Sequence, residues 1–162
     1  MRIARASARG VDELVPLMTR SPLLQRYGIT ARRARAVLGE ALRERDILLV
    51  ARDRGETIGM AWVIPSRALD RSAYLRLLLV AEGRQSRGVG AALLTNAERR
   101  AQAAGARHLV LLVTATNRRG RAFYRRTGYA HVATLPRFVR PRLDEALYVK
   151  HLSPVRRTRA HA

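Results

Sequence analysis

Two near-continuous apolar runs stand out along the chain, Tyr74–Val80 (YLRLLLV) and His108–Thr114 (HLVLLVT). Runs of this length without a polar face predict strands that are buried on both sides at the centre of a sheet. Between them, apolar residues recur at helical spacing from Gly88 to Ala104, and Gly105 follows as a helix C-cap. A strand–helix–strand unit of this kind predicts a right-handed crossover and a parallel pair of strands.

The rest of the chain alternates between shorter apolar segments and turn signals, which predict the remaining elements. Further strands are predicted where apolar or β-branched residues gather between turns, at Arg2–Ala6, Asp46–Arg52, Glu56–Ile64, Tyr129–Leu135 and Ala146–Leu152. Further helices are predicted from helical periodicity and capping residues, at Val11–Met18, Ala31–Arg43 and Asn117–Thr127. Loops are predicted over polar or proline-containing segments, at Ser21–Thr30, Pro65–Asp70, Glu82–Arg87 and Pro136–Glu145.

This order of elements predicts an α/β (α+β) fold built on one mixed sheet. The Asp53-Arg54-Gly55 turn joins two predicted strands into a hairpin, which requires antiparallel pairing. Together with the parallel pair, this gives a mostly antiparallel sheet of six to seven strands with helices on both faces. A chain of 162 residues is long enough for one domain. We place that domain at residues 1–153 and expect the basic segment 154–162 to be a disordered tail.

The charge of the chain is strongly one-sided. Its 32 Lys and Arg residues outnumber 12 Asp and Glu residues, which gives a formal net charge of +20, and Lys150 is the one lysine. Dedicated nucleic-acid-binding arms carry dense blocks of like charge, whereas these arginines are spread over the whole chain. We therefore interpret the charge as a solvated basic surface, part of which could hold an anionic ligand, and expect no dedicated nucleic-acid binding.

Composition excludes several classes of site. The chain has no cysteine, so it has no disulfide, no thiolate metal ligand and no cysteine nucleophile. Its four histidines have no metal-ligand spacing, so no metal site is predicted. No apolar run approaches the roughly 18 residues of a membrane span, and the first residues lack the apolar segment of a signal peptide. We expect a cytoplasmic protein that does not bind membranes.

The segment that ends the first central strand and opens the long helix carries the first chemical signal. It reads Gln85-Ser86-Arg87-Gly88-Val89-Gly90. Two glycines at a helix N-terminus, where N–H groups are unpaired and the helix dipole is positive, can hold a phosphate or pyrophosphate. A P-loop would require a lysine here, and a Rossmann fingerprint would require a glycine at Leu93, so both motifs fail. Taken alone, the glycines are equally compatible with close packing of the helix on the sheet.

A second motif follows the second central strand. It reads N-x4-A-F-Y-x3-G-Y and runs from Asn117 to Tyr129, with Tyr124 seven residues after the asparagine. Combined with the Q-x-x-G-x-G pattern that starts at Gln85, it resembles the GCN5-related N-acetyltransferase (GNAT) family. The resemblance is clear from about Tyr74 to Tyr129, and the predicted order of elements on both sides also fits that family.

The resemblance implies direct transfer of an acetyl group from acetyl-CoA to a primary amine of a small molecule or protein. Carried over to this chain, the cofactor-binding residues are Leu78, Leu79, Val80, Gln85, Ser86, Arg87, Gly88, Val89, Gly90, Ala91 and Asn117. The Val80 N–H would polarise the thioester carbonyl, and Tyr124 would protonate the leaving thiolate as general acid. A splayed gap is expected between the strands ending at Val80 and Ala115, with Tyr124 pointing into it.

The residue that deprotonates the amine is not evident from the sequence. In the branch of the family that acetylates ribosomal-protein N-termini, a glutamate lies five positions before the asparagine, and that position here is Leu112. This departure argues against that branch. The nearest carboxylates by sequence are Asp70 and Glu56, and we expect ordinary turn or surface roles for both. A chain of water molecules is the alternative.

The sequence does not identify the amine acceptor. Tyr27 and Phe138 lie in segments that shape the acceptor site in the family, and Trp62 is a further candidate whose default is a core position. Two other functions stay open. One is a non-catalytic acyl-CoA-binding sensor with the same fold, which the missing base motivates, and the other is a basic nucleic-acid-binding protein. A homodimer formed through the C-terminal strands is also left open.

Overall fold

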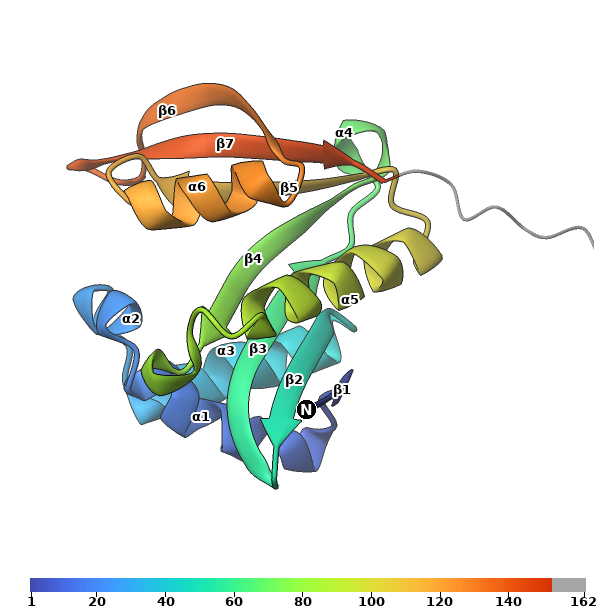
Figure 1. Cartoon of the computed structure of the whole chain (residues 1–162), viewed down its shortest axis with the longest axis vertical. Helices are drawn as coiled ribbons and strands as arrows, with labels where there is room; N and C mark the ends of the chain where they lie inside the picture. Colours follow the sequence, from blue (N-terminus) through green and yellow to red (C-terminus); the bar gives the residue numbers. More distant parts are fainter. Residues whose placement is uncertain (153–162) are drawn as a thin grey trace, which may run out of the picture.

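The computed structural model of the chain describes residues 1–152 (Figure 1). Its strands are β1 (Arg2–Arg5), β2 (Ile47–Asp53), β3 (Glu56–Ile64), β4 (Ser72–Val80), β5 (His108–Thr114), β6 (Ala130–Arg140) and β7 (Leu143–His151). Its helices are α1 (Val11–Thr19), α2 (Pro22–Arg26), α3 (Ala31–Arg43), α4 (Ala68–Arg71), α5 (Val89–Ala103) and α6 (Arg118–Arg126), with 3-10 turns η1 (Ala8–Gly10) and η2 (Glu82–Arg84). The end of the predicted domain at residue 153 and the predicted tail, 154–162, lie outside the described residues.

The strands form one sheet in the order β1-β2-β3-β4-β5-β7-β6. Neighbouring strands are antiparallel except β4 and β5, which are parallel. The chain connects these two strands through α5, as the strand–helix–strand pattern predicted. The α/β fold class, the mostly antiparallel mixed sheet and the central parallel pair are therefore confirmed.

Helices cover both faces of the sheet, which confirms the predicted layers (Figure 1). On one face, α1 and α3 pack against β2, β3 and β4 around buried side chains such as Leu38 and Leu48. On the other face, α5 packs through side chains such as Leu93, and this cluster continues to Leu111 of β5 and Tyr148 of β7. Full burial stabilises the fold by about 1.5–3 kcal/mol for each large apolar side chain. Both layers therefore hold β4 firmly at the centre.

The two central strands separate along their length. Pairing joins Ser72–Leu75 of β4 to His108–Leu111 of β5 and then stops, although β4 continues to Val80 and β5 to Thr114. A β-bulge at Arg76 marks the point at which β4 bends away. Figure 1 shows β4 diverging from the β5 and β7 layer. The predicted gap between the two strand ends is thus present.

The prediction of a loop at Pro136–Glu145 is wrong, because the hairpin of β6 and β7 extends through most of this segment. Pro136 is tolerated there since β6 is the last strand of the sheet, and an edge strand leaves one side of its backbone unpaired. The pairing is irregular at this point, and the Arg137 N–H donates instead to the Asp144 carboxylate at 3.0 Å. The Asp144 side chain thus replaces a backbone acceptor of the hydrogen-bond ladder between β6 and β7.

The loop predicted at Ser21–Thr30 contains a helix, α2. Its N-cap is Ser21, whose hydroxyl accepts a hydrogen bond from the Leu24 N–H at 3.4 Å, and Pro22 occupies the first helical position. Five residues are too few to show helical periodicity, which is why the pattern missed this helix. Residues of α2 reach the gap between β4 and β5, so this short helix becomes a wall of the site.

Candidate active site

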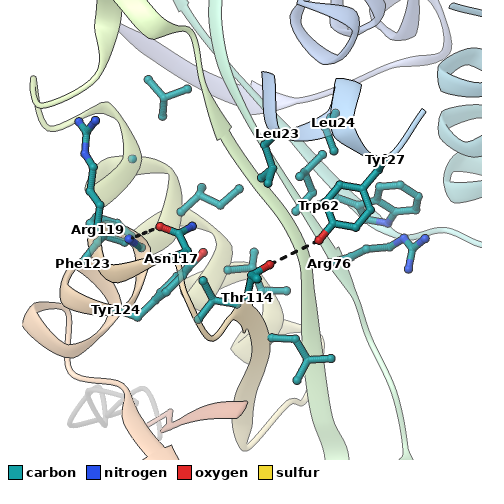
Figure 2. A pocket seen from close by; sticks show the side chains of 18 of the residues that line it. Leu23, Leu24, Tyr27, Trp62, Arg76, Thr114, Asn117, Arg119, Phe123 and Tyr124 are labelled. Carbon is teal, nitrogen blue, oxygen red and sulfur yellow. Dashed lines mark hydrogen bonds between the residues drawn. The ribbon is translucent and has the colours of Figure 1, made fainter. Parts of the chain in front are cut away.

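A cavity of about 1080 Å³ occupies the gap between β4 and β5 (Figure 2). Its walls come from these two strands, the loop before α5, α6, and α2 with the start of α3. Of the predicted site residues, the cavity brings together Leu78, Val80, Gln85, Ser86, Gly88, Gly90, Ala91, Asn117 and Tyr124. The side chains of Leu79 and Val89 belong to the cores on either face of the sheet, and Arg87 is exposed outside the lining.

The loop before α5 has the shape of an anion-binding concavity. Ser86 and Gly88 have positive φ values of 61° and 79°, and a Cβ built on Gly88 would meet nothing within 4 Å. The first turn of α5 has no side-chain cap, so its leading N–H groups stay available to a ligand. Arg119 of α6 donates a hydrogen bond to the Ser86 hydroxyl at 3.0 Å. Backbone donors and a guanidinium thus meet at one rim, which suits a phosphate or diphosphate.

The end of β4 presents its backbone to the gap. The Ala81 N–H donates to the Ile58 carbonyl of β3 at 2.9 Å, and N–H directions alternate along a strand. The Val80 N–H therefore points the other way, toward the edge that β5 has left. Gln85 folds over this edge and donates from Nε2 to the Val80 carbonyl at 3.3 Å. An extended ligand can pair with such an edge as an added strand.

Helix α6 places Tyr124 on the wall opposite that edge. Asn117 caps the helix by accepting a hydrogen bond from the Gly120 N–H at 2.9 Å. The Tyr124 ring packs edge-on against Phe123 and Tyr129, with ring centroids 5.2 and 5.7 Å away. Figure 2 shows Tyr124 and Asn117 together on one side of the cavity. Within residues 1–152 the Tyr124 hydroxyl has no hydrogen-bond partner, so it can bond to a ligand.

Burial sets the protonation of this phenol. It raises the pKa of Tyr124 well above the ordinary 10.0, and the neighbouring Tyr74 raises the pKa further. Burial also raises the pKa of Tyr74, the nearby Arg76 partly offsets this rise, and Glu145 adds a smaller contribution that raises it. Tyr124, Tyr74 and Glu145 all line the same cavity, and the Tyr124 hydroxyl is protonated at neutral pH.

Sequence reasoning missed one carboxylate that lies in the cavity. Glu145 of β7 is paired with Thr114 of β5 and is only 3% exposed. Among the lining residues that the structure describes, it is the one acidic side chain. Burial raises the pKa of Glu145 above the ordinary 4.5, and the Thr114 hydroxyl partly offsets this rise. Glu145 was missed because it lies at the end of the segment that was wrongly predicted as a loop. Acidic residues are common in exposed loops, so its position gave no indication of a functional role.

The carboxylates considered from the sequence lie away from the cavity. Asp70 forms an ion pair with Arg107 at 2.7 Å, and Glu56 forms one with Arg84 at 2.7 Å. Neither carboxylate lines the cavity. The surface roles expected for both are therefore confirmed.

The wall opposite Tyr124 contains two of the three acceptor candidates. Tyr27 and Trp62 line the cavity, whereas Phe138 is 64% exposed on β6 and does not. The Tyr27 hydroxyl lies 3.4 Å from the Thr114 hydroxyl, and the Arg140 guanidinium stacks 4.4 Å from the Tyr27 ring centroid. Figure 2 shows this link from α2 across to β5. Tyr27, which follows α2 directly, thereby contacts both β5 and β6. We refer to the wall that carries Tyr27, Trp62 and Arg140 as the acceptor side.

The described part of the chain lacks two other kinds of feature. Residues 1–152 hold no group of three or more His, Asp or Glu side chains that could bind a metal ion. No helix within that range combines the length and apolarity needed to cross a bilayer. The cavity instead combines four features. They are the anion-binding loop before α5 around Ser86 and Gly88, which we call the anion cradle, the unpaired edge of β4, the Tyr124 phenol and the buried Glu145 carboxylate.

Comparison with solved structures finds the same fold in several proteins. An aminoglycoside 6'-N-acetyltransferase complexed with coenzyme A has a TM-score of 0.80 at 19% identity, over 96% of this chain and 99% of that chain. An N-acetyltransferase from Staphylococcus aureus Mu50 has a TM-score of 0.78 at 19% identity, over 94% and 98%. The ribosomal-protein-S18-alanine N-acetyltransferase from Escherichia coli has a TM-score of 0.75 at 18% identity, over 97% of each chain. At identities of 18–19%, this structural similarity shows that the proteins share a fold.

Sequence comparison supplies the family. The curated proteins give no match to the chain. The family model described as Acetyltransferase (GNAT) family matches residues 13–129, a range that contains both motifs, the two central strands and the crossover helix between them. The chain therefore belongs to the GNAT acetyltransferase family.

Proposed function

We propose that the protein is an acetyl-CoA-dependent N-acetyltransferase that transfers the acetyl group directly to a primary amine. The observation that carries this proposal is the unpaired edge of β4, which lies between the anion cradle and the Tyr124 hydroxyl. A ligand with a diphosphate at one end, an extended arm and a thioester at the other end requires an anion-binding loop, a free strand edge and a proton donor in this order.

The chain's residues fit the parts of acetyl-CoA. The N–H groups at the start of α5, from Gly88 to Ala91, would hold the pyrophosphate, with Ser86 and the exposed Arg87 on the same rim. The backbone of Leu78 to Val80 would pair with the amides of the pantetheine arm. Asn117 uses its side-chain oxygen to cap α6, so its amide nitrogen would contact the arm.

The same residues account for the chemistry. The Val80 N–H would stabilise the negative charge that develops on the thioester oxygen as the amine attacks, a contribution typically worth about 10²–10³ in rate for one donor. Tyr124 would then give its proton to the departing sulfur, whose thiolate has a pKa of about 8.5 by analogy with cysteine. Burial keeps the Tyr124 hydroxyl protonated until that step.

Binding is tested by thermal denaturation with acetyl-CoA. Ligand at about 100 times Kd stabilises the folded state by about 2.7 kcal/mol, which raises the Tm of a domain of this size by about 5–10 °C. Ala91→Glu puts a carboxylate in the first turn of α5, where it favours the helix but repels a diphosphate, so the Tm shift should disappear. Thr95→Glu, one turn further along α5, is the matched control and should retain the Tm shift with acetyl-CoA. A wild-type protein without a shift refutes coenzyme binding, and a shift that survives Ala91→Glu refutes the role of the loop.

A turnover assay separates the enzyme from a non-catalytic acyl-CoA sensor. Both predict the thermal shift, but only the enzyme releases free coenzyme A when primary amines are added. The missing base was the reason to consider a sensor, and the buried Glu145 in the cavity supports the enzyme instead.

A further inference from the structure

The acceptor side of the cavity carries an uneven set of charges. Glu145 is the single carboxylate among the described lining residues, whereas Arg33, Arg76 and Arg140 also line that side. The remaining arginines of the lining belong to α6 on the opposite wall. An acceptor therefore meets one negative group within a positive surrounding.

Strand alternation determines which way Glu145 faces. Val113 and Ala146 are cross-strand partners on β5 and β7, and both side chains belong to the core beneath α5. The next cross-strand pair, Thr114 and Glu145, therefore points to the other face of the sheet, which Tyr27, directly after α2, reaches through its hydrogen bond to Thr114. Tyr124 packs against the α5-side core. The phenol and the carboxylate thus approach the gap from opposite faces.

Glu145 has no cationic partner within residues 1–152. It takes part in none of the ion pairs formed there, and no arginine contributes to its pKa. Buried carboxylates are normally paired, because an isolated buried charge is strongly unfavourable. The ammonium group of a ligand would supply the missing partner. The raised pKa of Glu145 also suits a group that must take a proton from that ammonium.

Two arginines on the acceptor side are held against aromatic rings. The Cζ atom of Arg140 lies 4.4 Å from the Tyr27 ring centroid, and that of Arg76 lies 5.1 Å from the Trp62 ring centroid. Neither guanidinium forms an ion pair with another described residue, although Arg76 lies near enough to Asp46, the hydrogen-bond acceptor of Trp62, to offset part of the rise that burial causes in the pKa of that carboxyl. A guanidinium stacked in this way keeps its N–H edge for a bidentate contact with a carboxylate or phosphate.

We propose that the acceptor is a primary amine that also carries an anionic group, a carboxylate or phosphate, on an apolar or aromatic body. This inference rests on the proposed function and names its substrate class. Glu145 receives the amine, Arg140 and Arg76 receive the anionic group, and the rings of Tyr27 and Trp62 contact the body between them. A polyamine fits poorly, because its further ammonium groups would face the arginines.

The transfer balances with these groups. Glu145 accepts one proton from the ammonium, and the nitrogen lone pair forms the C–N bond at the thioester carbon. The C–S bond breaks with its electron pair on sulfur, which takes the Tyr124 proton. The nitrogen loses a second proton, which returns to Tyr124 through solvent. The products are an amide, a free thiol and the one proton first held by Glu145.

Matched pairs of amines test the inference with the wild-type protein. 4-(Aminomethyl)benzoate differs from benzylamine, and phosphoethanolamine from ethanolamine, by the anionic group alone. We expect kcat/KM to be higher for the anionic member of each pair by about 10- to 100-fold, the factor expected from one hydrogen bond to a charged group. Spermidine, a polycation, should be the poorest acceptor.

Variants assign the preference to its residues. In the double variant that combines Arg76→Gln and Arg140→Gln, the ratio of kcat/KM for the anionic amine to kcat/KM for its partner without the anionic group should fall toward one. Arg142→Gln, exposed outside the lining in the β6–β7 turn, is the matched control and should keep the ratio. Glu145→Gln keeps the size of the side chain but cannot take the proton. It should lower kcat/KM for both members by about 10²–10⁴-fold while the Tm shift with acetyl-CoA remains.

The outcomes distinguish this inference from the proposed function. Absence of the acetyl-CoA shift, or a shift without thiol release for any amine, overturns the function itself. Benzylamine, ethanolamine or spermidine acetylated as fast as the anionic amines overturn the acceptor class alone, as does transfer to those amines without transfer to any anionic amine. A preference that survives in the double arginine variant also overturns it.

Discussion

Tyr124→Phe is expected to lower kcat by about 10²–10⁴-fold, the usual contribution of a general acid. The substitution removes only the hydroxyl, and that group has no hydrogen-bond partner within residues 1–152. The ring keeps its edge contacts with Phe123 and Tyr129. We therefore expect the KM for acetyl-CoA, the Tm shift and the free energy of unfolding to change little. The measurement is release of free thiol at saturating acetyl-CoA, together with a thermal melt.

Tyr148→Phe is the matched control for this change. The Tyr148 ring lies 6.3 Å from the Tyr124 ring, but its hydroxyl accepts a hydrogen bond from Arg121 at 3.2 Å and lies outside the cavity lining. The control should keep kcat near that of the wild type and lose about 1 kcal/mol of stability. An equal fall of kcat in both variants, or none in Tyr124→Phe, removes Tyr124 from the role of acid.

The pH profile gives a second readout of Tyr124. Burial holds the pKa of this phenol above 10.0, so the protonated form persists through neutral and mildly alkaline pH. Since the acid acts in its protonated form, kcat should show no decline from its ionisation below that pH. A decline at lower pH that disappears in Tyr124→Phe would contradict the protonation that burial imposes.

The cofactor side of the site was predictable because its signals are local. The glycines between Gln85 and Ala91 and the capping Asn117 act on backbone within a few residues, so their spacing is visible in the sequence. The apolar runs identified both central strands, and a parallel pair brings the segments after their carboxyl ends to one edge. Tyr124 followed from its spacing to Asn117 and from the family resemblance.

The acceptor side was not predictable in the same way. Its residues come from elements far apart in the chain: Tyr27 from the end of α2, where it is the C-cap, Trp62 from β3, Arg76 from a bulge in β4 and Glu145 from β7. Which of them meet depends on the strand order and on the bulge, and no local pattern determines either. Glu145 was lost because Pro136 and the surrounding arginines read as a loop, although an edge strand tolerates them.

Lys150→Met is expected to destabilise the fold by about 2–3 kcal/mol, somewhat less than the loss of a fully buried ion pair because this pair is partly exposed. Lys150 of β7 donates to both carboxylate oxygens of Glu98 on α5, each at 2.9 Å, and to the Thr127 carbonyl at 2.9 Å. The Tyr129 hydroxyl donates to the same carboxylate at 3.0 Å. Methionine keeps the apolar stem but leaves Glu98, whose side chain is 15% exposed, with one neutral donor.

Arg107→Met is the matched control, because the Arg107–Asp70 pair is even closer, at 2.7 Å against 2.9 Å, but its side chains are 58% and 62% exposed. Such a surface pair contributes at most about 1 kcal/mol. Urea denaturation should therefore separate the two variants, and the Lys150→Met protein should melt about 4–12 °C below the wild type. Adding Glu98→Gln should recover part of the loss, since it removes the carboxylate left without a cation. If the two single variants unfold alike, the link from α5 through Glu98 to β7 adds no stability. The hydrophobic core alone would then hold the Tyr129 ring against Tyr124.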